Sequence, residues 1–167
     1  MKKKPRSALE QLLAVMARLR APQGCPWDRA QNHRTLRFHA VEEVYELLDA
    51  IEAGDDHEMA EELGDLLMQV VFHAQMASEI GAFDFADVVQ AISEKMLRRH
   101  PHIFGAEQIL TAGDQRTAWE NIKAGERAVG SDTSAVAGIG QALPALSRAS
   151  KLGKRAARVG FDWPEID

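Results

Sequence analysis

The sequence predicts an all-α fold, and three observations support this class. Apolar residues recur at intervals of three and four along most of the chain. Glycine, proline and small polar residues separate these periodic segments from one another. No segment alternates apolar and polar residues over a length useful for a strand. We therefore expect an antiparallel bundle of helices.

The first helix is predicted over residues 7–20, where leucines and a methionine recur at helical spacing. The stretch APQGCPWD then breaks the pattern with two prolines and a glycine. Asp28 or Asn32 is a candidate cap for the helix that follows. Two long helices are predicted next, over 35–53 and 55–80, with a short break at Gly54.

The second half of the chain reads as shorter elements. The stretch FDFADVVQAISEKMLRRH predicts a helix that ends at Pro101, and a loop is expected after it. A short helix is predicted around Trp119, and residues 130–141 resemble a flexible linker by composition. A basic helix is predicted over 142–159. We therefore expect a helical domain over 1–129, the linker, and a basic C-terminal helix and tail over 142–167.

Composition excludes several classes of protein. The chain has 167 residues, about one domain, with 46% hydrophobic and 27% charged residues, which is typical of a globular protein. One cysteine, Cys25, excludes an internal disulfide and fits a reducing compartment. No apolar run reaches membrane-spanning length, and the first residues lack the apolar core of a signal peptide. These features predict a cytoplasmic protein without a membrane partner.

Charge is distributed unevenly along the chain. The window 38–94 holds fifteen of the 25 acidic residues and none of the 20 lysines and arginines. The window therefore carries −15 and the remainder +10. Because like charges one helical turn apart repel, a block of one sign needs compensation. Bound cations are one source of it, and the basic remainder suits an anionic ligand.

Four acids in this window are placed symmetrically about the predicted turn. Glu43 and Glu46 lie eight to eleven residues before Gly54, and Glu62 and Asp65 lie the same distance after it. A helical hairpin therefore brings the two pairs to the same height, and each pair can direct two carboxylates to one spot. Four unpaired carboxylates would repel strongly, and a divalent cation would remove that repulsion.

Ligand chemistry predicts which metal this site prefers. Carboxylates alone suit Mg²⁺, with Mn²⁺ as a possible substitute, and both ions keep positions for water and phosphate oxygens. A di-iron bundle would use Glu-x-x-His, and no glutamate here has a histidine three residues later. The alternative is a solvated acidic face. The symmetric pairs in a segment without basic residues favour the metal.

These residues resemble a known family. EEVYE followed by ELGD is similar to the E-E-x-x-E…E-x-x-D signature of MazG nucleoside triphosphate pyrophosphohydrolases. GCPWDRAQNHRTL, ISEKMLRRHPHIFG, WENIKAGER and ALPALSRASKLGKRAARVGFDW also resemble MazG segments, in MazG order. The resemblance implies an all-α NTP pyrophosphatase fold and hydrolysis of a nucleoside triphosphate to monophosphate and pyrophosphate. It also implies Mg²⁺ ligands at Glu43, Glu46, Glu62 and Asp65.

The resemblance further implies a homodimer, or a higher oligomer, in which helices of two subunits complete the bundle. Many MazG proteins carry two such domains in tandem, and one signature is present here. The chain is expected to be a single-domain member or an N-terminal half. The alternative function is a non-catalytic half that binds nucleotides or serves regulation or dimerisation.

Further residues are candidates for the reaction. Glu43, Glu42 or Glu61 is a candidate acceptor of the proton from the attacking water. Lys95, Arg98 and Arg99 share a helix face and are candidates to clamp the triphosphate, although cations also commonly decorate a helix C-terminus.

Smaller candidates complete the set. Trp27 and Trp119 are candidates to stack on a base, although core packing is the commoner role of tryptophan. Lys123 is a candidate phosphate contact, and Asp28 is a substrate contact or a helix cap. The basic C-terminal helix is more typical of a solvated face than of a nucleic-acid contact, so nucleic acid is an unlikely partner.

Overall fold

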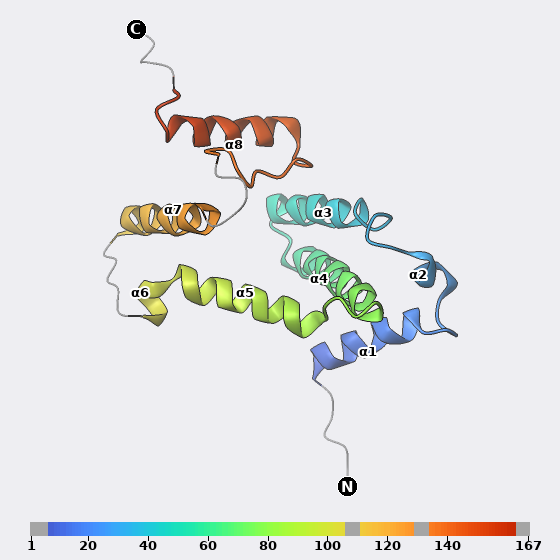
Figure 1. Ribbon diagram of the computed structural model, residues 1–167. Helices are drawn as coiled ribbons and strands as arrows, with labels where there is room; N and C mark the ends of the chain where they lie inside the picture. The colour runs from blue at the N-terminus through green and yellow to red at the C-terminus, as the bar shows by residue number, and fades with distance from the viewer. Residues whose placement is uncertain (1–6, 106–110, 129–133, 163–167) are drawn as a thin grey trace. The chain divides into compact units, whose positions relative to one another are not determined.

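The structure is a computed structural model that describes residues 7–105, 111–128 and 134–162 (Figure 1). Within these ranges every regular element is a helix, as the sequence predicts. In chain order the helices are α1 (Ala8–Arg20), α2 (Pro26–Ala30), α3 (His39–Ala53), α4 (Asp56–Glu79), α5 (Phe85–Arg99), α6 (Pro101–Phe104), α7 (Ala112–Ala128) and α8 (Ala145–Ala157).

The first helix begins at the predicted place because its N-terminus is capped. The Ser7 hydroxyl accepts a hydrogen bond from the Glu10 N–H, and the Glu10 carboxylate accepts one from the Ser7 N–H. This reciprocal pair satisfies two N–H groups that the helix leaves free.

The third helix begins later than predicted, at His39 instead of residue 35. Asn32 caps a turn, because its Oδ1 accepts hydrogen bonds from the N–H groups of Arg34 and Thr35. Asp28 is no cap either, since it lies inside α2. Because the side chain of Asn32 satisfies these N–H groups in a turn, the helix begins further along the chain.

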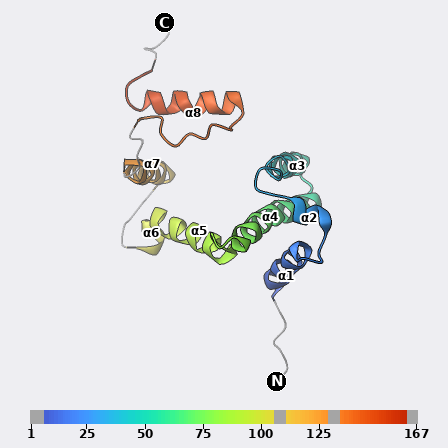
Figure 2. The same cartoon turned by 45° about the vertical axis from the view of Figure 1, so that its right-hand side comes forward.

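The hairpin of α3 and α4 forms as predicted. Gly54 ends α3 with a φ of 67°, a left-handed conformation that glycine adopts without steric cost. Asp55 caps α4 by accepting hydrogen bonds from the N–H groups of His57 and Glu58. The two helices pack against each other, as Figures 1 and 2 both show.

The later helices differ from the prediction mainly in extent. Residues 101–104 form the short helix α6 where a loop was expected. The helix around Trp119 has 17 residues, and α8 is shorter than the predicted 142–159. The predicted linker over 130–141 lies partly outside the described residues, and within its described part Ala137 is buried.

The chain divides into two compact units, Met1–Glu94 and Lys95–Asp167. In the first unit, α1 packs against α2 and α4, and α3 packs along α4. The core of this unit lies where α1, the segment before α3 and the second half of α4 meet. Its buried members are Met16, Leu36, Val71, Phe72 and Met76.

Arg20 ties the same elements together at the edge of this core. Its guanidinium donates to both carboxylate oxygens of Glu79, each at 2.7 Å, and to the Asp28 carbonyl at 2.5 Å. It also lies 5.4 Å from the centre of the Phe72 ring. A charge that is nearly buried is therefore fully paired, as its burial requires.

The apolar sides of the hairpin helices are partly exposed among the described residues of the first unit. Large apolar side chains on both helices stay between 39% and 54% exposed: Val41, Val44, Tyr45, Leu48, Ile51, Leu63, Leu67 and Val70. On α3 it is instead Ala50 that is buried, with Glu43 and Leu47 half-buried on the same side. The side of α3 that carries Glu43 therefore faces α4.

No helix in the described ranges is both long enough and apolar enough to cross a membrane.

Candidate metal centre

Three of the four predicted carboxylates come together between α3 and α4. Glu43 on α3 and Glu62 and Asp65 on α4 each place one carboxylate oxygen within 4.8 Å of the other two. Glu43 and Glu62 are half-buried, and Asp65 is exposed. The hairpin therefore brings these acids to one height, as their distances from Gly54 predict. We call Glu43, Glu62 and Asp65 the carboxylate cluster.

Glu46, the fourth predicted ligand, lies beside this cluster and outside the 4.8 Å group. Its side chain is exposed on α3. Its charge nevertheless contributes to the raised pKa of Glu62 and of Glu43. Glu46 thus lies near the cluster, one turn further along α3.

Burial and repulsion act together on the cluster. The pKa of Glu43 is raised, first by burial and then by the charges of Asp65, Glu46 and Glu42, while a hydrogen bond from Gln69 opposes the shift. The pKa of Glu62 is raised by burial and then by the charges of Glu46 and Asp65. Both shifts show that the folded chain disfavours the ionised carboxylates.

The donor set fits a hard divalent cation. Oε2 of Glu62 is buried and has no hydrogen-bond partner. An unpaired buried carboxylate oxygen is costly unless something binds it. Carboxylate oxygens are the ligands that Mg²⁺ and Mn²⁺ prefer. The cluster therefore offers carboxylate oxygens to such an ion, and one of them, Oε2 of Glu62, has no other partner.

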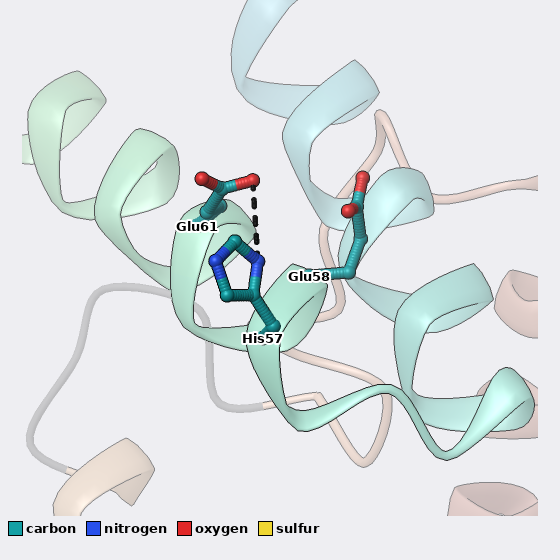
Figure 3. A group of neighbouring side chains, drawn as sticks. All are labelled: His57, Glu58 and Glu61. Carbon is teal, nitrogen blue, oxygen red and sulfur yellow. Dashed lines mark ion pairs between the residues drawn. The ribbon is translucent and has the colours of Figure 1, made fainter.

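Two acids considered as proton acceptors lie outside the cluster. Glu42 contacts His39 at 3.0 Å on the exposed side of α3. Glu61 lies 3.8 Å from Nδ1 of His57, and Figure 3 shows these two side chains with Glu58 in the first turns of α4. All three residues in Figure 3 are exposed, and an exposed pair one turn apart is ordinary on a helix surface.

The predicted phosphate clamp belongs to the second unit. Arg98 donates to Glu126 at 3.0 Å, and Arg99 donates to the same carboxylate at 2.5 Å. These bonds lower the pKa of Glu126 to about 2. Arg99 also lies 5.3 Å from the centre of the Trp119 ring. The two arginines are therefore oriented by a carboxylate, and their role as a clamp, with the half-buried Lys95, stays a prediction.

Lys123 lies in a basic pocket of the second unit. It donates to Glu120 at 2.9 Å, and Glu120 also accepts from Arg158. The pocket has a volume of about 410 Å³, and Lys151 and Lys154 of α8 also line it. Its charge suits an anion, and a phosphate contact by Lys123 stays a prediction.

The remaining candidates, Trp27 and Asp28, belong to α2. Trp27 is 55% exposed and meets His39 edge-on at 6.1 Å between ring centres. It is thus not a core tryptophan. The Asp28 carbonyl binds Arg20.

Sequence reasoning missed one residue at the cluster, Gln69. This residue is only 4% exposed, and its Nε2 donates to Oε1 of Glu43 at 3.2 Å. The signal was present, because Gln69 interrupts a stretch in which Met68, Val71 and Phe72 make α4 apolar on all sides. A polar residue inside such a stretch needs a polar partner.

The sequence of the chain is similar to those of known proteins. Residues 31–104, which contain the whole cluster, match the family model described as the MazG nucleotide pyrophosphohydrolase domain. The chain is 50% identical, over 95% of its length, to the nucleoside triphosphate pyrophosphohydrolase of Escherichia coli K12, and covers 60% of that protein.

Two further relatives resemble the chain. A nucleoside triphosphate pyrophosphohydrolase/pyrophosphatase MazG from Thermotoga maritima is 46% identical over 93% of this chain and 59% of its own length. The nucleoside triphosphate pyrophosphohydrolase of Mycobacterium tuberculosis is 38% identical over 89% of this chain and 45% of its own length. The chain thus spans about 60% of the length of the first two relatives.

Proposed function

We propose that the chain is a member of the MazG family, because residues 31–104 match the MazG model, and that it hydrolyses nucleoside triphosphates to the monophosphate and pyrophosphate in a Mg²⁺-dependent reaction. The observation that carries this proposal is the carboxylate cluster, with the unpartnered buried oxygen of Glu62, inside the segment that matches the MazG model. The relatives' names point to the same reaction. Nucleotide-pool sanitation or balance in the cytoplasm is the role we assign to it.

Glu43, Glu62 and Asp65 would hold the metal, with Glu46 as the fourth ligand from the neighbouring turn. Bound there, Mg²⁺ would supply positive charge for the phosphate oxygens and would lower the pKa of a water molecule. The chain's own acids orient the ion, because they project from two packed helices and not from a loop. Glu43 lies in the cluster, whereas Glu42 and Glu61 lie outside it, so Glu43 is the best placed candidate for the proton acceptor.

A second copy of this chain is the partner we assign to the exposed apolar faces of α3 and α4. Eight large apolar side chains stay partly exposed on these two adjacent helices, and apolar side chains that gather on a surface commonly mark an interface. These helices also carry the carboxylate cluster, on the sides that face each other.

The test is to incubate the purified chain with each common NTP and dNTP and Mg²⁺, and to identify the products. Pyrophosphate and the monophosphate are expected, and Glu62→Gln should abolish turnover while helicity stays intact. Asp49→Asn, an exposed acid on α3 outside the cluster, is the matched control. Release of orthophosphate, or no turnover with any substrate, would contradict the proposal. Nucleotide binding without turnover would support the alternative of a non-catalytic half.

A further inference from the structure

Gln69 is the one polar side chain that is buried among the described residues. It lies on α4 one helical turn after Asp65, and its neighbours along the helix pack into the core of the first unit. An apolar side chain of the same size would fit such surroundings and would need no hydrogen-bond partner. The amide at this position therefore needs an explanation that packing does not supply.

The burial of this amide is only partly compensated. Nε2 of Gln69 donates to Oε1 of Glu43 at 3.2 Å, but the amide oxygen of Gln69 is buried without a hydrogen-bond partner. An unpaired buried carbonyl oxygen destabilises a fold. The fold thus tolerates an unfavourable group at this position, and its single hydrogen bond goes to the carboxylate cluster.

The chemistry of an amide suits this position. Because a carboxylate only accepts hydrogen bonds, the amide must present its NH₂ group and not its oxygen to Glu43. The bond uses one of several lone pairs on the carboxylate and leaves the others for a ligand. A lysine or arginine would also donate here, but its charge would neutralise the cluster and compete with a cation. A neutral donor orients Glu43 without that competition.

We propose that Gln69 is a positioning residue for the metal site: it holds the Glu43 carboxylate in the orientation in which it binds the cation. The inference rests on the proposed function, because it assumes that the carboxylate cluster binds a divalent ion. Gln69 itself does not touch the ion or the substrate. It acts through Glu43, as residues that hydrogen-bond to metal ligands commonly do.

The test measures Mn²⁺ binding to the full chain by electron paramagnetic resonance, without nucleotide. Gln69→Met keeps the length of the side chain and removes the donor, and it should weaken Mn²⁺ binding by about 10- to 100-fold. Gln75→Met is the matched control, because Gln75 lies on the same helix and donates to Glu79, outside the cluster. The control should bind Mn²⁺ as the wild type does.

Thermal unfolding in EDTA separates positioning from a structural role. A purely structural Gln69 would lower the unfolding midpoint of Gln69→Met and leave Mn²⁺ affinity unchanged, and this result overturns the inference alone. Absence of Mn²⁺ binding to the wild type overturns the proposed metal site as well.

If Gln69→Met does not fold, nuclear magnetic resonance of the wild type tests whether Gln69 responds to metal binding. The side-chain amide signals of Gln69, assigned through its own backbone, should shift when Mg²⁺ is added, and those of Gln75 should not. Unshifted Gln69 signals at saturating Mg²⁺ overturn the inference.

Discussion

Replacing Glu43 by glutamine should make the metal-free protein more stable and the metal-bound protein less so. Glutamine keeps an oxygen that accepts the hydrogen bond from Gln69, but it removes one negative charge from the carboxylate cluster. The substitution therefore relieves repulsion when no cation is present. It also removes a ligand, so less stabilisation by Mg²⁺ is expected.

The distance within the cluster sets the magnitude. Two unit charges 4.8 Å apart, the upper limit between these oxygens, repel by about 0.9 kcal/mol in water and about 3.5 kcal/mol at an effective dielectric constant of 20. Glu43 is half-buried and Asp65 is exposed, so solvent screening places their repulsion near the lower value. We expect Glu43→Gln to raise the free energy of unfolding by about 1 kcal/mol without metal.

Urea unfolding in EDTA and in Mg²⁺ measures both effects. At a hundred times its dissociation constant, Mg²⁺ should stabilise the wild type by about 2.7 kcal/mol, so the order of stability of wild type and variant should reverse. Asp49→Asn, on the same helix, should leave both values unchanged. A Glu43→Gln protein that is less stable than the wild type in EDTA would refute the reasoning, because repulsion would then not dominate the cluster.

The sign of the pH dependence follows from the raised pKa of Glu43. A carboxyl whose pKa is higher in the folded than in the unfolded chain stabilises the fold below its ordinary pKa of 4.5. That contribution is lost as the pH rises through the raised, folded value. In EDTA, the free energy of unfolding of Glu43→Gln should therefore equal that of the wild type in acid. It should exceed the wild-type value above pH 4.5, and the difference should persist at neutral pH.

Three further predictions concern the rest of the chain. Arg20→Ala should lower the free energy of unfolding by about 2 kcal/mol in urea titrations, because it removes two charge-assisted bonds to the partly exposed Glu79; an unchanged midpoint would contradict this. Glu126→Gln should lower the stability of the second unit above pH 4.5. The wild type should lose the same contribution only as the pH falls from 4.5 toward the lowered pKa of about 2. Hydrogen exchange of α7 measures this difference, and equal protection in both proteins would argue against it. Leu48→Asp should dissociate the proposed dimer in sedimentation experiments, whereas Leu146→Asp, on α8, should not; dissociation by both would contradict the assigned interface.

Local sequence determined the helices and the meeting of the acids. Helical periodicity, Ser7 and Asp55 as caps, and Gly54 at the turn depend on residues within a few positions of each other. Because the rise and turn of a helix are constant, equal distances from Gly54 are enough to place Glu43 near Asp65. The carboxylate cluster lies within residues 31–104, the part of the chain that matches the MazG model.

Tertiary structure decided which side of each helix meets which partner. Periodicity identifies an apolar side of α3, but it does not tell whether that side packs within the chain or against another copy. In the fold, the side with Glu43 and Ala50 faces α4, and the apolar side stays exposed.

The polar partners were likewise set by packing. Gln69 bonds to Glu43 across the hairpin, and Arg99 bonds to Glu126, 27 residues away. Such pairs depend on the angle and separation at which packed helices come to lie, and many side chains share in determining both. The acids of the metal site could therefore be predicted from spacing along the chain, whereas the residue that orients them became visible only in the folded molecule.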